Sequence, residues 1–335
     1  MKAVIATEQG GAEVLQLAEV PTPEPQAGQV RVRILASGLN PIDTKVRKAK
    51  LPMTPRQFPA ILQTDFAGVV DLVGPGVTKF NIGDEVFGFA GGFSSPNGDV
   101  SGSLAEYAVY DPAFIARKPA NLDFHAAAAL PLVASTAWKA LFDKARVTPE
   151  SRVLITGGAG GVGLMAIQMA VAAGAYVVAV TRSAESTEVA MAAGARACVD
   201  LSSAAAADIV STHTNGRGFD VIFDTVGGAT LDAAFQMIKP AGDIVTVVGA
   251  ASHNLAPLYL KGANLHMVLV LLPIMYGIGI ERHSEILEII TTLAEQGRLV
   301  PRLDSERFGL ADAAAAHAKL EAGQAKGKIV IDVTG

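Results

Sequence analysis

The sequence contains a single cysteine, Cys198, among its 335 residues. One cysteine excludes a disulfide within the chain and a zinc centre built from several thiolates. Charged residues are also scarce, at 18% of the chain, and the formal net charge is −5. This balance argues against nucleic acid or an anionic membrane surface as the main partner.

Long hydrophobic runs are absent as well. The most apolar stretch, residues 267–280, is shorter than a membrane span and is interrupted by Pro273 and two glycines. The first six residues are followed at once by polar residues, which does not fit a secretory signal. Half of the residues are hydrophobic, and the length is typical of two domains. We therefore expect a soluble, cytoplasmic protein of two domains.

The glycine-rich turn at residues 157–163 is the most informative segment. A buried-strand pattern (153–156) precedes it, a helix pattern (162–173) follows it, and a second strand pattern covers 176–181. In this context a G-x-G-x-x-G spacing lets backbone N–H groups approach a pyrophosphate at a helix N-terminus. The alternative is a turn with no ligand. The predicted cofactor-binding residues are Gly158, Ala159, Gly160, Gly161, Val162 and Gly163.

The order of the predicted elements divides the chain. The first 120 or so residues are rich in short strands, such as 29–35, 68–73, 85–89 and 106–110, separated by Gly, Pro and Asp turns. From about residue 123, strands and helices alternate, which predicts an α/β fold with a doubly wound parallel sheet. After about residue 260 come two helices (281–296 and 310–320) and a strand (328–333), which we expect to return to the N-terminal domain.

This organisation, together with several motifs, resembles the medium-chain dehydrogenase/reductase superfamily, and specifically its zinc-free quinone oxidoreductase branch. The resemblance covers essentially the whole chain. It implies a β-rich, GroES-like catalytic domain (1–122 and 262–335) and a dinucleotide-binding Rossmann domain (123–261). The motifs are Gly38–Asp43, Asp65–Val70, Ile82–Gly88, Leu130–Trp138, the glycine-rich turn and Asp224–Gly228.

The resemblance also bears on zinc. Zinc-dependent members place a cysteine after the first long strand and a His-Glu pair further on. The corresponding positions here are Ser37 and Thr64–Asp65. The six histidines, at 125, 213, 253, 266, 283 and 317, are scattered with no close pair. We therefore expect no catalytic metal site.

The residues that end the second strand of the βαβ unit indicate which nicotinamide cofactor binds. NAD sites place an acidic side chain there to bind the ribose hydroxyls. This chain has Thr181, Arg182 and Ser183, which would hold a 2′-phosphate and therefore favour NADPH. The alternative is that Arg182 is only a solvated charge. The family often adds a lysine slightly further on, where this chain has Ser186, and a tyrosine where it has Leu201.

The resemblance implies further site residues. Asn40 and Asp43 would lie on a loop facing the nicotinamide, although a turn asparagine and a bracing aspartate would look the same. Thr136 resembles a residue near the nicotinamide, or a helix-packing threonine. Four residues at two strand ends would line the sheet edge where dinucleotides lie, and these are Val226, Gly227, Val248 and Gly249.

The proton donor is the weakest part of the pattern. The family often has a tyrosine just after the Asn-Pro-x-Asp turn, but this chain has Lys45 at the nearest position and no tyrosine before Tyr107. The catalytic candidates are therefore Asn40, Asp43 and Lys45, where Lys45 would need partial desolvation to act. The alternative for Lys45 is an ordinary solvated side chain.

These features predict an NADPH-dependent, zinc-free reductase of quinones or related conjugated carbonyls. One alternative is an enone or enoyl-thioester reductase, for which the basic run Arg47–Lys50 would hold a phosphate of the carrier. Another is a non-enzymatic NADPH-binding protein that acts as a sensor or as a structural protein. The apolar, β-prone run Met267–Leu272 is expected to form a sheet edge that joins two chains into a homodimer.

Overall fold

A computed structural model describes residues 1–96 and 98–334. The chain divides into two compact units, one formed by residues 1–135 and 271–335 and the other by residues 136–270. These boundaries lie beyond the predicted ones at residues 122 and 261. The difference has two causes: helix α2 (Phe124–Ala128) packs on strands of the first unit, and β16 (Asn264–Met267) pairs with β15 of the second.

The second unit is built on six parallel strands. In space they follow the order β13-β12-β11-β14-β15-β16, which is the doubly wound arrangement that the sequence predicted. The strands are β11 (Arg152–Ile155), β12 (Tyr176–Val180), β13 (Ala197–Val199), β14 (Phe219–Asp224), β15 (Ile238–Thr246) and β16. Short apolar runs rich in valine and isoleucine form them, as expected for strands that are covered on both faces.

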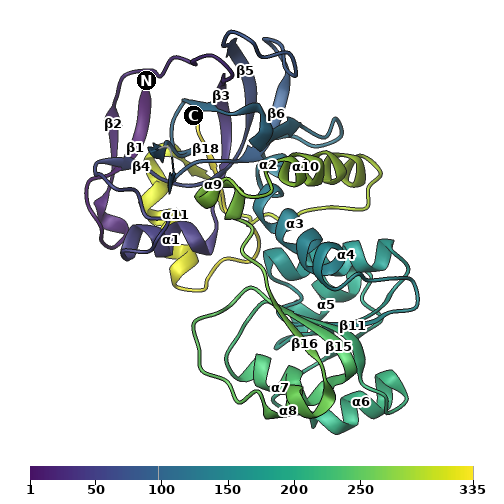
Figure 1. Cartoon of the computed structure of the whole chain (residues 1–335). Coiled ribbons are helices and arrows are strands. Elements are labelled where there is room, and N and C mark those ends of the chain that lie inside the picture. The colour runs from purple at the N-terminus through teal and green to yellow at the C-terminus, as the bar shows by residue number, and fades with distance from the viewer. Residues whose placement is uncertain (97, 335) are drawn as a thin grey trace. The chain divides into compact units, whose positions relative to one another are not determined.

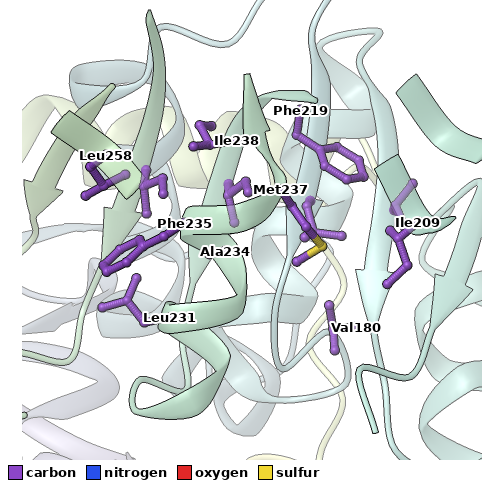
Figure 2. Close-up of a cluster of buried hydrophobic side chains, with 13 residues drawn as sticks. Val180, Ile209, Phe219, Leu231, Ala234, Phe235, Met237, Ile238 and Leu258 are labelled. Atoms are coloured by element: carbon purple, nitrogen blue, oxygen red, sulfur yellow. The ribbon is translucent and has the colours of Figure 1, made fainter. Parts of the chain in front are cut away.

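Helices cover both faces of this sheet (Figure 1). On one face lie α4 (Gly161–Ala172) and α5 (Ala184–Ala192), and on the other α6 (Ala206–Thr214), α7 (Ala229–Met237) and α8 (Ala256–Lys261). Figure 2 shows Phe235 of α7 near Leu258 of α8, and Met237 of α7 on the side of Ile209 of α6. This buried cluster also includes Phe219 and Ile238 from the strands, and it fixes the helices on the sheet.

The first unit contains a seven-stranded, mainly antiparallel sheet in the order β10-β6-β5-β3-β18-β17, with β9 also paired to β3. A three-stranded sheet, β2-β1-β4, and the hairpin β7-β8 complete its strands. The bounds are β1 (Lys2–Ala6), β2 (Leu15–Glu19), β3 (Val30–Gly38), β4 (Ala60–Ile61), β5 (Asp65–Val73), β6 (Glu85–Phe89), β7 (Phe93–Ser95), β8 (Gly98–Val100), β9 (Tyr107–Tyr110), β10 (Ile115–Arg117), β17 (Phe308–Gly309) and β18 (Val330–Asp332).

The C-terminal segment returns to the first unit, as predicted. Strand β18 pairs with β3, so residues about 290 positions apart in sequence are neighbours in one sheet. Helix α11 (Ala313–Glu321) packs beside α1 (Pro41–Lys48), and the two are drawn side by side in Figure 1. The other helices are α3 (Pro131–Trp138), α9 (Leu272–Tyr276) and α10 (Ile280–Glu295).

The prediction that the run Met267–Leu272 forms a sheet edge is largely wrong. Only Met267 belongs to edge strand β16, and Leu272 begins α9. Val268, Val270 and Leu271 are buried and the other three residues of the run are exposed, so the run does not form a continuous apolar edge. Over the described ranges, 1–96 and 98–334, no helix has the length and apolar character needed to cross a membrane.

His317 on α11 is a fully buried histidine, and neither ring nitrogen has a hydrogen-bond partner within the described part of the chain. Burial lowers the pKa of His317 to about 3, and the nearby Arg47 charge acts in the same direction. The folded protein therefore holds this ring neutral. The unfolded chain binds a proton near the ordinary histidine pKa of about 6.5. Stability from this site is thus present above that pH and is lost as the pH falls.

We predict that His317→Leu makes the protein less sensitive to mild acid. Between pH 7 and pH 5 the wild type should lose about 2 kcal/mol more of its free energy of unfolding than the variant loses, because only the wild type gains a proton on unfolding. Urea denaturation at both pH values measures the difference. Identical losses in the two proteins would contradict the neutral buried histidine.

Candidate active site and cofactor site

Asn40 and Asp43 lie at the start of helix α1, which the sequence analysis treated as a loop. Asn40 is the N-cap residue and Pro41 occupies the first helical position. The Asp43 carboxylate accepts a hydrogen bond from the Asn40 backbone N–H at 2.7 Å. Asn-Pro-x-Asp is thus a helix start with half of a capping box, a signal in the sequence that would have predicted the helix.

The side chain of Asn40 is held between two buried charges. Its Nδ2 donates to Asp65 Oδ2 at 2.8 Å, and its Oδ1 accepts from Lys328 Nζ at 2.7 Å. Lys328 Nζ also donates to the Leu39 carbonyl at 2.9 Å and lies 3.4 Å from Asp65 Oδ2. The Leu132 backbone N–H donates to the other oxygen of Asp65 at 3.0 Å. Asp65 and Lys328 are therefore site residues that the sequence analysis did not select.

Burial governs the electrostatics of this cluster. Desolvation raises the pKa of Asp65 and lowers the pKa of Lys328, while the attraction between the two opposes both shifts. Desolvation also raises the pKa of Asp43 to about 8, against the hydrogen bond from the Asn40 backbone. The shift favours the protonated form of Asp43. Its Oδ1 is buried and has no hydrogen-bond partner within residues 1–96 and 98–334.

Two of the positions that correspond to zinc ligands, Ser37 and Asp65, make other hydrogen bonds, whereas the buried Thr64 hydroxyl has no partner within the described residues. Ser37 Oγ lies 2.6 Å from both Gln63 Nε2 and Ser103 Oγ, and Ser103 Oγ donates to the Asp65 carbonyl at 2.9 Å. Thr64 is fully buried. In the described part of the chain, no three His, Cys, Asp or Glu side chains are grouped so that they could hold a metal ion.

Lys45 does not join this cluster. It is exposed, and on a helix it points about 200° away from Asp43. The neighbouring basic run is also not a free patch, because Arg47 is completely buried and pairs with Glu321, as does Lys48. The proposed phosphate-binding role for the run Arg47–Lys50 is therefore wrong for Arg47, whereas Lys48 is 49% exposed and stays a prediction.

The second unit contains the glycine-rich turn between β11 and α4. Gly160 is the N-cap of α4 and makes no side-chain cap, so the first N–H groups of the helix remain available to a ligand. A Cβ at Gly163 would lie 2.2 Å from the Gly157 carbonyl oxygen, and one at Gly158 would lie 2.9 Å from the Ala179 side chain. The close packing excludes side chains here, and these residues fit the pyrophosphate of a dinucleotide.

The other predicted cofactor residues lie at the same edge of the sheet. Thr181–Ser183 follow β12, Val226–Gly227 follow β14 and Val248–Gly249 follow β15. These strands and β11 are four parallel neighbours, so their carboxyl ends meet at one edge, where dinucleotides bind in this fold. Thr136, on α3, is buried.

Asp224, at the end of β14, organises this edge and was not among the predicted site residues. Its buried carboxylate accepts hydrogen bonds from the Thr156 hydroxyl at 2.9 Å, the Thr246 hydroxyl at 3.0 Å and the Gly227 N–H at 2.9 Å. It thus ties together the ends of three adjacent strands and fixes the Val226–Gly227 turn. The sequence contained it in the Asp224–Gly228 motif, but not its partners.

The three residues after β12 have different roles. The Ser183 hydroxyl accepts from the Ser186 N–H at 3.1 Å and caps α5, and the Thr181 hydroxyl lies 2.8 Å from that of Thr187. Arg182 is exposed beside this helix N-terminus. Arg182 is therefore the side chain most available to an anionic group at this end of the sheet.

Comparisons with known proteins agree with this geometry. Residues 26–120 match the sequence model described as the alcohol dehydrogenase GroES-like domain, and residues 161–292 match the one described as zinc-binding dehydrogenase. The chain is 32% identical to quinone oxidoreductase of Rattus norvegicus, covering 95% of this chain and 93% of that one. The chain belongs to the medium-chain dehydrogenase/reductase superfamily, in its quinone oxidoreductase branch.

Two further relatives support this placement. The NADPH-dependent alkenal/one oxidoreductase of Arabidopsis thaliana is 31% identical, and the alignment covers 99% of this chain and 79% of that protein. An alcohol dehydrogenase superfamily protein of Novosphingobium aromaticivorans, known from its crystal structure, is 39% identical. Its fold matches with a TM-score of 0.93 over 99% of both chains. The protein is therefore an oxidoreductase of this superfamily, with a GroES-like domain and a Rossmann-like domain.

Proposed function

We propose that this protein is an NADPH-dependent, zinc-free reductase of conjugated carbonyl compounds, with quinones as the first choice and enones as the second. The observation that carries the proposal is the polar cluster around Asn40, in which Lys328 pairs with Asp65, a residue at a position that corresponds to a zinc ligand in zinc-dependent members. The names of the rat and Arabidopsis relatives, which refer to a quinone and to alkenals and enones, support this substrate class.

When bound, NADPH supplies a hydride. The chain's own residues would bind and orient the reactants: the glycine-rich turn holds the pyrophosphate, and Asn40 contacts the reacting groups. A conjugated carbonyl needs little further activation, because the electrons it receives delocalise onto oxygen. Modest polar contacts and orientation therefore suffice. A cytoplasmic location is part of the proposal and can be checked by cell fractionation.

The proposed reaction predicts a specific pattern of activity. NADPH oxidation should be supported by quinones or enones and hardly at all by simple alcohols or aldehydes, and a chelator should leave the rate unchanged. Asn40→Ala should lower kcat about tenfold or more, since small misplacements of reacting groups cost large factors in rate. Lys45→Met, measured in parallel, tests whether that exposed lysine supplies a proton. Turnover of simple alcohols only, or loss of activity with the chelator, would contradict the proposal.

The cofactor prediction rests on Arg182. Arg182→Ala should weaken NADPH binding by about 1.5–3 kcal/mol, a loss of roughly 10- to 150-fold in Kd, and should leave NADH binding nearly unchanged. Calorimetric titration of both cofactors measures this. Arg196→Ala is a matched control, because Arg196 is an exposed arginine that precedes β13, at the opposite edge of the sheet. Equal affinity of the wild type for the two cofactors would contradict the assignment.

We also propose a homodimer formed through edge strand β16. This strand ends the six-stranded sheet and Met267 on it is 52% exposed, so its free backbone groups can pair with those of a second copy. Sedimentation at micromolar concentration should give twice the 34.5 kDa of the chain. A monomer under those conditions would refute this assembly.

A further inference from the structure

The cluster around Asn40 allows only one orientation of its amide group. With the amide oxygen toward the Lys328 ammonium and the nitrogen toward the Asp65 carboxylate, both contacts are favourable, at 2.7 and 2.8 Å. A rotation by 180° would place the amide NH₂ against an ammonium, which has no acceptor, and the amide oxygen against a carboxylate, which has no donor. All three side chains are at least 92% buried, so water cannot replace the lost contacts.

We propose that Lys328 and Asp65 are positioning residues for the reaction, which act by fixing the amide of Asn40. This inference rests on the proposed function, because it assumes that Asn40 contacts the reactants. One Nδ2 hydrogen and one lone pair of Oδ1 remain outside these two contacts, and their order around the amide is then fixed.

Neither charged residue is free to act on a substrate directly. The Lys328 ammonium has three hydrogens and three protein acceptors, the Leu39 carbonyl, Asn40 Oδ1 and Asp65 Oδ2. The Asp65 carboxylate receives Asn40 and Lys328 on one oxygen and the Leu132 N–H on the other. Both residues therefore act through Asn40, and the three groups join segments up to 288 residues apart in sequence.

A comparison of a variant that lacks only Lys328 with one that lacks both charges distinguishes a positioning role from a structural role. Lys328→Met leaves the Asp65 carboxyl buried without its cation and should destabilise the protein, whereas the double variant Asp65→Asn/Lys328→Met removes both charges and should regain most of the stability. With the charges gone, the amide no longer has one preferred orientation. The double variant should therefore keep a kcat about tenfold or more below wild type while its unfolding temperature returns toward wild type.

Lys319→Met is the matched control. Lys319 forms ion pairs with the buried Asp304 and with Glu306 in the same C-terminal segment, and not with the Asn40 cluster, so its loss should reduce stability with kcat unchanged. In an Asn40→Ala background, Lys328→Met should cause no further loss of kcat, because the group it positions is gone. A crystal structure of the double variant should show the Asn40 amide displaced or in both orientations.

The outcomes distinguish failure of the proposed function from failure of the positioning role. Should the wild type turn over no quinone or enone, the proposed function fails, and the crystal structure still tests whether the charges fix the amide. Where the wild type is active, recovery of kcat together with stability in the double variant would overturn the positioning role. Independent, multiplicative losses for Asn40→Ala and Lys328→Met would overturn it too.

Discussion

The buried carboxylate of Asp65 is the constraint on which the first unit depends. A charge removed from water costs several kcal/mol unless other groups satisfy it, and Asp65 is fully buried. Its side chain is satisfied by Asn40 at the start of α1, by Leu132 in the first turn of α3 and by Lys328 just before β18. The return of the C-terminal segment to this unit is therefore part of the site, because it delivers the only cation among these partners.

A buried carboxylate organises the second unit as well, but the groups that satisfy its charge are neutral. Asp224 is also a fully buried carboxylate, but its partners are hydroxyls and backbone N–H groups, not a cation. Neutral donors suffice because they come from the ends of neighbouring strands that the sheet already holds together. The carboxylate thus fixes the positions of the strand ends, and these strand ends and the glycine-rich turn form one edge of the sheet. In both units a buried acid orders the functional residues without being exposed to a ligand itself.

Local patterns predicted much of this architecture. The strand–turn–helix pattern of the second unit, its parallel sheet and the presence of a C-terminal strand follow from periodicity and from glycine placement, which act over short stretches of chain. Helix α1 was missed although Asn40, Pro41 and Asp43 form a recognisable helix start. The roles of Lys328 and Asp224 were missed because they depend on partners far away in the sequence. The contact between Lys328 and Asp65 joins residues 263 positions apart, and no motif around Lys328 predicts that contact. The prediction that residues 267–272 form a sheet edge was largely wrong because β-propensity does not reveal whether a segment packs on its own chain.

All three N–H donors of Lys328 are bonded to protein acceptors, and this limits the chemistry that the site can support. A zinc ion with an open coordination position can bind an alcohol oxygen and stabilise the alkoxide. The Lys328 ammonium lies beside the corresponding residues, but all of its donors are used by protein acceptors, so it cannot polarise a substrate in that way. The strongest contact left is a neutral amide in a fixed orientation. In the proposed function, such a contact suits a substrate that is already electron-poor, as a conjugated carbonyl is and a simple alcohol is not.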